Sequence, residues 1–192
     1  LNLKQNEVYN AIDNFRKGTE SSDSINEWRN ASYCYSQIGR CMMTLHDYKG
    51  AIKAWDESIK RYKGIASKIN IPSDRIHQAL AYYYLKNYDK MRTIYKSVEK
   101  IEFTSSFTQT RKMMLRSYIA LVDKEYSKSL AIADSIKDNQ MRFIVKDHIY
   151  LETHNYKDGL KNLTSILDID VEKYKKMKKD DNEALKAQST II

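Results

Sequence analysis

The sequence predicts an all-α fold on the basis of its composition and its apolar spacing. The 192 residues include only 5 Gly and 1 Pro, too few for a turn-rich β architecture. Within the stretch 33–59, apolar and small residues recur at i, i+3, i+4 and i+7 on two successive segments. This is the spacing of two amphipathic helices, which we expect to be joined at Leu45-His46-Asp47.

Small residues mark the predicted contact between these two helices. The first helix places Tyr35, Ile38, Gly39 and Met42 on one face, and the second places Tyr48, Ala51, Trp55 and Ser58 on one face. Gly39 and Ala51 occupy little volume, so the two helix backbones are expected to approach closely there.

This pattern resembles the tetratricopeptide repeat (TPR), a helix–turn–helix unit of about 34 residues. Ile38 stands at the position where the repeat has Leu, Met42 stands at its second aromatic position, and its closing Pro is absent. One unit cannot bury its apolar face alone, so the resemblance implies that further units follow.

The second-helix signature recurs in degraded form. Its copies are Asp47, Tyr48, Ala51, Trp55; Asn87, Tyr88, Met91, Tyr95; Glu125, Tyr126, Ser129, Ala133; and Asn155, Tyr156, Gly159, Leu163. The resemblance therefore implies a right-handed α-solenoid of antiparallel helix pairs over residues 1–168. The copies are unevenly spaced, which indicates helices of variable length.

The first predicted element is an orphan helix over 3–17, with Val8, Ala11, Ile12 and Phe15 facing inward. It is similar to the second helix of a unit whose first helix is missing. We expect a turn-rich link over 17–24, with Ser24 as the N-cap of the next helix. The first complete pair is then expected around 25–65.

Pro72 is the next predicted boundary, because proline has no backbone N–H to donate inside a helix. The second pair is expected over 73–100, with Ser73 as its N-cap.

The third pair is expected over 105–137 and the fourth over 139–167, with Asp138-Asn139 as the turn between them. On the first helix of the fourth pair, Ile144, His148 and Leu151 are expected to share the inward face. Lysine-rich residues 169–192 are expected to form a C-terminal capping or connector helix.

Charge and cysteine content restrict the function classes. The net charge of +8 is spread along the chain, which favours a solvated outer face over a nucleic-acid-binding one. Cys34 and Cys41 lie two helical turns apart, roughly 10 Å, which is too far for a disulfide. No run of about 18 apolar residues is present, so we expect no transmembrane segment. The sequence does not indicate a compartment.

The sequence shows no recognisable catalytic motif. It lacks HExxH, CxxC, GxSxG and a glycine-rich phosphate loop. His148 and His154 are six residues apart, so they do not form an i, i+4 zinc pair on a helix. We expect no enzymatic activity, no catalytic residue, no metal site and no cofactor.

The TPR resemblance implies a concave groove lined by the first helix of each pair. In the first unit it implies that Tyr33, Ser36, Arg40 and Met43 face this groove. In later units we expect Tyr84, Leu115 and Ile149 there, with burial in the core as the open alternative. Chaperone-binding members of the family use a Lys/Asn/Arg clamp for a carboxylate. Ser36 and Arg40, followed by mostly apolar or aromatic residues, depart from that clamp. They favour an apolar or aromatic peptide ligand, or packing against another part of the same protein.

The function expected from this resemblance is a non-enzymatic scaffold that binds a protein or peptide partner. One alternative is a sensor or regulatory domain of a larger bacterial signalling protein or transcription regulator. A second, less favoured alternative is a basic solenoid that binds nucleic acid, which predicts binding with a steep salt dependence.

Overall fold

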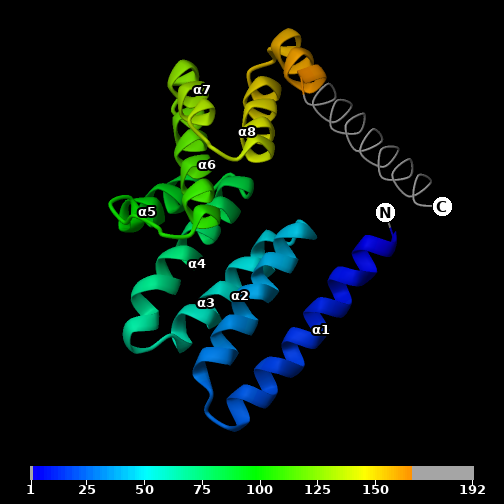
Figure 1. Ribbon diagram of the computed structural model, residues 1–192, viewed down its shortest axis with the longest axis vertical. Helices are drawn as coiled ribbons and strands as arrows, with labels where there is room; N and C mark the ends of the chain where they lie inside the picture. Colours follow the sequence, from blue (N-terminus) through cyan, green and yellow to red (C-terminus); the bar gives the residue numbers. More distant parts are fainter. Residues whose placement is uncertain (1, 166–192) are drawn as a thin grey trace, which may run out of the picture.

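The computed structural model describes residues 2–165, and these residues form helices joined by short connections (Figure 1). The helices are α1 Asn2–Ser24, α2 Trp28–Thr44, α3 Tyr48–Arg61, α4 Gly64–Tyr84, α5 Tyr88–Val98, α6 Ser106–Val122, α7 Tyr126–Asp134 and α8 Asn139–Glu152, followed by a helical stretch over 156–165. No strand occurs in the described part of the chain. The all-α prediction is confirmed.

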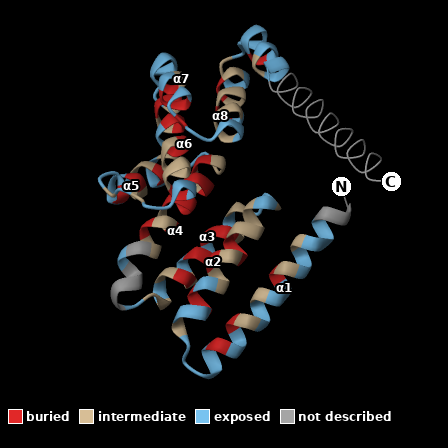
Figure 2. Cartoon of the chain, in the orientation of Figure 1, coloured by how far each residue is buried: buried red, intermediate tan, exposed pale blue. Residues whose placement is uncertain are grey.

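Neighbouring helices pack in pairs, and α4 and α6 connect the pairs. Helix α1 packs on α2, α2 on α3, α4 on α5 and α6 on α7. Helix α4 also contacts α3 and α6, and α6 also contacts α8. In Figure 2 the buried residues therefore follow the faces where α2, α3, α4 and α6 meet their neighbours, while α1 is buried along one stripe only.

Five helix-to-helix connections share one turn geometry. Each has a residue with positive φ at its centre: Asn26, His46, Lys86, Lys124 and His154, with φ between 56° and 61°. At the second of these, the N–H of Asp47 donates to the carbonyl of Met42, and the N–H of His46 donates to that of Met43. These two bonds define a Schellman C-cap, which satisfies carbonyls that the end of a helix leaves without partners. The predicted link at 45–47 is confirmed.

The predicted end of the first helix is wrong, because α1 continues through the expected link to Ser24. Thr19 and Ser22 are buried, and a Cβ atom on Gly18 would lie 2.9 Å from Cys34 Sγ of α2. The small residues of this segment thus allow α1 to approach α2. The Thr19 hydroxyl donates to the Arg16 carbonyl within the helix. Helix α1 thus packs on α2, and Glu27 rather than Ser24 is the N-cap of α2.

The predicted boundary at Pro72 is also wrong. Helix α3 ends at Arg61, and α4 begins at Gly64 and continues through Pro72 to Tyr84. Ser73 is therefore an interior residue of α4. Proline removes one hydrogen bond from a helix, and the tertiary contacts of the segment that follows offset that loss here. Asp74, Ile76 and Ala79 are all buried against neighbouring helices.

The inward face of α8 differs from the predicted one by one residue. Val145 and Ile149 are fully buried, whereas Ile144 and Leu151 are 40% and 54% exposed. Helix α8 contacts both α6 and α7, so the face that lies between those two helices is the one that is buried. His148 is half-buried and lies 2.6 Å, through Nε2, from the hydroxyl of Tyr83.

The third pair and the start of the fourth follow the prediction. The Ser105 side chain caps α6 by accepting from the Thr108 N–H, and Asp138 caps α8 by accepting from the Met141 N–H. No helix within the described residues is long and apolar enough to cross a membrane. The predicted capping or connector helix over 169–192 lies outside the described residues.

Candidate functional site

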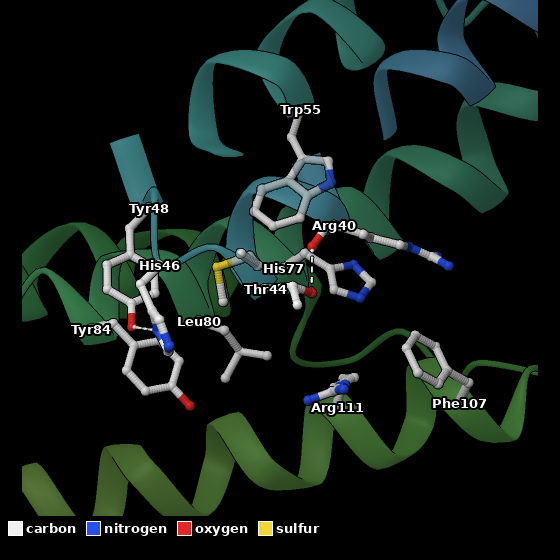
Figure 3. Close-up of a pocket in the computed structure, with 11 residues that line it drawn as sticks. Arg40, Thr44, His46, Tyr48, Trp55, His77, Leu80, Tyr84, Phe107 and Arg111 are labelled. Carbon is white, nitrogen blue, oxygen red and sulfur yellow. Dashed lines mark hydrogen bonds between the residues drawn. The ribbon is translucent and has the colours of Figure 1, made fainter. Parts of the chain in front are cut away.

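A cavity of about 330 Å³ lies where α2, α3, α4 and α6 meet (Figure 3). Its wall consists of Arg40, Met43, Thr44, His46, Tyr48, Trp55, His77, Leu80, Tyr84, Phe107 and Arg111. We call it the central cavity. Three helix pairs contribute to it, so the cavity exists only after those pairs have packed against one another.

Aromatic rings form two stacks in its wall. His77 of α4 lies between Trp55 of α3 and Phe107 of α6, with ring centroids 5.5 Å and 5.9 Å away and an interplanar angle of 27° in both cases. Tyr48 and Tyr84 stack at 5.1 Å with an interplanar angle of 12°. Stacked rings are stiff and apolar, so they give the cavity a defined shape.

Two arginines from different helices approach the same ring. The guanidinium carbons of Arg40 and Arg111 each lie 5.2 Å from the centroid of Phe107, a distance typical of cation–π contacts. Figure 3 shows the Arg40 side chain extending towards the side of the cavity where Phe107 lies, with Arg111 lower in the same part of the cavity wall. Within residues 2–165 neither guanidinium forms an ion pair with a carboxylate. The Arg40 Nε is buried without a hydrogen-bond partner.

The arginines make this region electropositive. Burial, and then the positive charge of Arg40, lower the pKa of Arg111 from its usual value, although nearby Tyr84, Tyr118 and Asp138 act in the opposite direction. Partly desolvated charges of one sign repel each other. An anion placed between them would relieve that repulsion.

His77 presents an unused hydrogen-bond acceptor beside the arginines. Its Nδ1 lies 2.8 Å from the Ser73 carbonyl, which only accepts, so Nδ1 bears the proton. Burial, assisted by Arg40, lowers the pKa of His77 to about 3, so the ring is neutral at pH 7. Nε2 is therefore a lone pair, and it is buried with no partner in the described part of the chain.

A second cavity of about 280 Å³ lies beside the first and shares Arg40 with it. At its base the buried carboxylate of Asp74 accepts hydrogen bonds from the hydroxyls of Ser36 and Ser58, each at 2.7 Å. These two bonds join α4 to α2 and α3. Burial raises the pKa of Asp74 to about 6, although the two hydroxyls and Arg40 each lower it.

The structure divides the predicted groove residues into three groups. Arg40, Met43 and Tyr84 line the central cavity. Tyr33, Ser36 and Arg40 line the second cavity, where Tyr33 is 56% exposed and Ser36 is buried. Leu115 and Ile149 are fully buried in the hydrophobic core and contribute to neither cavity.

Several cavity residues were not anticipated from the sequence. His77, Phe107 and Arg111 lie on α4 and α6, and Asp74 directly follows Ser73, which was expected to be an N-cap. Phe107 and Arg111 are four residues apart, so they share a helix face, and this spacing was a usable signal. The sequence gives no sign that this face meets Arg40, because that contact depends on how two pairs pack.

The chemistry that the central cavity offers is recognition of an anion next to an apolar group. It combines two cations without carboxylate partners, one neutral acceptor and aromatic walls. Among residues 2–165, no group of three or more His, Cys, Asp or Glu side chains is arranged to hold a metal ion. The sequence matches no known family model, and neither a curated protein nor a solved structure is significantly similar to it.

Proposed function

We propose that this protein is a non-enzymatic binding module that recognises an acidic peptide segment of a partner through its central cavity. The proposal rests on one observation: Arg40 and Arg111, from two different helix pairs, both contact the Phe107 ring and have no carboxylate partner in the described residues. Arginines that pair with no carboxylate of their own chain are suited to pair with a carboxylate of another molecule.

The proposed architecture is a right-handed TPR-like solenoid in which α2, α4 and α6 line the binding face. Support comes from the pairwise packing of neighbouring helices and from the repeated Schellman turn. Tyr48 and Tyr84 add an apolar wall, which suits an aromatic or aliphatic side chain next to the acidic residue of the peptide.

Selection from a displayed library of random nine-residue peptides tests this function. The full chain is the target, and the Arg40→Ala/Tyr84→Ala variant is the competitor. We expect enriched peptides that carry an acidic residue beside an aromatic or branched apolar one. A library that yields no enrichment, or peptides that the variant retains equally well, would contradict the proposal.

A further inference from the structure

The polar groups of the central cavity specify more than an anion. Arg40 and Arg111 supply donors only, since a guanidinium has no acceptor. His77 Nε2 supplies a lone pair, and a lone pair repels the oxygens of an anion. A ligand that satisfies all three side chains must therefore present an anionic oxygen pair to the arginines and an N–H or O–H to His77.

We propose that the central cavity is a binding site for a small organic acid whose carboxylate lies between Arg40 and Arg111. An N–H or O–H group next to the carboxylate donates to His77 Nε2. An apolar or aromatic body lies against Leu80, Tyr84 and Met43.

The size of the cavity agrees with such a ligand. Its volume of about 330 Å³ lies at the lower end of the usual range for small-molecule sites, about 300–1,000 Å³. The two guanidinium carbons are at most twice 5.2 Å apart, because each lies at that distance from the centroid of Phe107. Both guanidinium groups therefore lie close enough to Phe107 to approach one ligand placed beside that ring.

Phosphate is the other common ligand of paired arginines, and the acceptor on His77 disfavours it. A phosphate dianion has only acceptor oxygens, so it would leave the lone pair of His77 Nε2 facing oxygens that cannot donate a hydrogen bond to it. Besides burial, the charges of Arg40 and Arg111 lower the pKa of His77, and no carboxylate raises it. The imidazole therefore stays neutral. The neutral ring therefore selects a donor.

This inference shares its cavity with the proposed peptide-binding function but can fail independently of it. If selected peptides bind in an Arg40-dependent manner while small acids do not bind, the ligand is a peptide segment and the small-acid proposal is overturned. If small acids bind and no peptide is enriched, the small-acid site stands and the peptide-binding function is wrong.

The test uses the full chain and four named probes, with dissociation constants measured by ligand-observed NMR. N-acetyl-L-phenylalanine has the carboxylate, the N–H and the aromatic body. Its C-terminal amide lacks the charge, 3-phenylpropanoate lacks the N–H, and phenyl phosphate replaces the carboxylate. We expect the first probe to bind, and the amide and phenylpropanoate to bind about tenfold more weakly or worse, since one charged or well-placed hydrogen bond is lost in each case. Phenyl phosphate binding more tightly than the first probe would overturn the proposal.

Variants assign the binding to the named side chains. Arg111→Met should weaken N-acetyl-L-phenylalanine about tenfold or more, whereas Arg116→Met, an exposed arginine on the same helix, should change it less than twofold. His77→Phe keeps the ring stack but removes the acceptor, so it should erase the difference between N-acetyl-L-phenylalanine and 3-phenylpropanoate. A His77→Phe variant that binds 3-phenylpropanoate and still discriminates between these two probes would contradict the role assigned to His77.

Discussion

A Cβ atom on Gly39 would lie 2.6 Å from two atoms of the Trp55 indole, closer than side chains approach in folded proteins. The indole is fully buried, and its Nε1–H donates to the Ser36 carbonyl at 3.2 Å. The absence of a side chain at Gly39 therefore allows α2 and α3 to pack at this distance. The spacing of small residues in the sequence predicted this close approach.

Gly39→Ala tests the contact with the smallest possible change. Within a helix the substitution normally stabilises by about 1 kcal/mol. Here the clash with Trp55 should outweigh that gain and lower the free energy of unfolding by about 1–3 kcal/mol, with Gly39→Leu lower still. Urea unfolding followed by circular dichroism measures it. Gly159→Ala is the control, because its Cβ would lie 3.4 Å from the nearest atom, an ordinary contact, so it should not destabilise.

Asp74 should make the free energy of unfolding fall as the pH rises through about 6. Burial raises its pKa from 3.8 to about 6 in the folded protein, so folding favours the protonated form. The stability from this group is fully present below the unfolded pKa and is lost as the pH rises through about 6. Asp74→Asn, which is neutral at every pH, should therefore raise the free energy of unfolding at pH 7 by about 1–2 kcal/mol relative to the parent.

The difference between these two proteins should shrink as the pH falls from 7 to 4. Thermal or urea unfolding at several pH values gives that difference directly. A difference that stays constant with pH would show that Asp74 does not titrate in this range. Asp74→Leu is the matched control for the hydrogen bonds, because it leaves the hydroxyls of Ser36 and Ser58 without their shared acceptor and should be destabilising at all pH values.

His77 should have the opposite effect, making the free energy of unfolding fall as the pH is lowered below about 6.5. Its folded pKa is lowered from 6.5 to about 3, chiefly by burial, so folding favours the neutral ring. Stability from this group is present above about 6.5 and is lost as the pH falls towards 3. His77→Phe should therefore be less sensitive to acid than the parent between pH 6.5 and 4. Equal losses of stability in the two proteins over this interval would contradict the buried neutral histidine.

The repeated Schellman turn offers a test on the protein surface. Lys86 and Lys124 adopt φ values of 57° and 61°, which cost a residue with a side chain about 1 kcal/mol relative to Gly. Lys86→Gly and Lys124→Gly should each raise the free energy of unfolding by about 0.5–1 kcal/mol. Lys53→Gly, an exposed position in the middle of α3, should instead lower it by about 1 kcal/mol. Three changes of the same sign would argue against the left-handed turns.

Helix pairs were predicted most reliably where the second-helix signature and the N-cap residues were clear in the sequence. The helices on either side of 45–47 and 123–125 have the apolar spacing that the sequence analysis used. Ser105 and Asp138 are residue types that commonly cap helices, and both do so here. Glu27, Trp28 and Ala31 repeat the start of the same signature at α2. This copy marks the beginning of α2 at Trp28.

The errors arose where tertiary contacts outweighed local preference. Pro72 and the serine- and glycine-containing segment 17–24 are poor helix formers, yet both are helical because their neighbours are buried. The central cavity could be predicted only in part. Arg40, Met43 and Tyr84 followed from the position of the first helices, whereas Arg111 lies far along the chain and meets Arg40 only through the packing of α4 on α6.

The central claim, that the central cavity binds a ligand through Arg40, is tested most directly by the affinity of one selected peptide for three proteins. Fluorescence anisotropy would compare the parent, Arg40→Ala, and Arg116→Ala as a charge-matched control on the exposed face of α6. We predict that Arg40→Ala raises the dissociation constant about tenfold or more, equivalent to about 1.4 kcal/mol, with an unchanged melting temperature. Arg116→Ala should change the dissociation constant less than twofold. Equal effects of the two substitutions would contradict the claim, since they would show that only the overall positive charge matters.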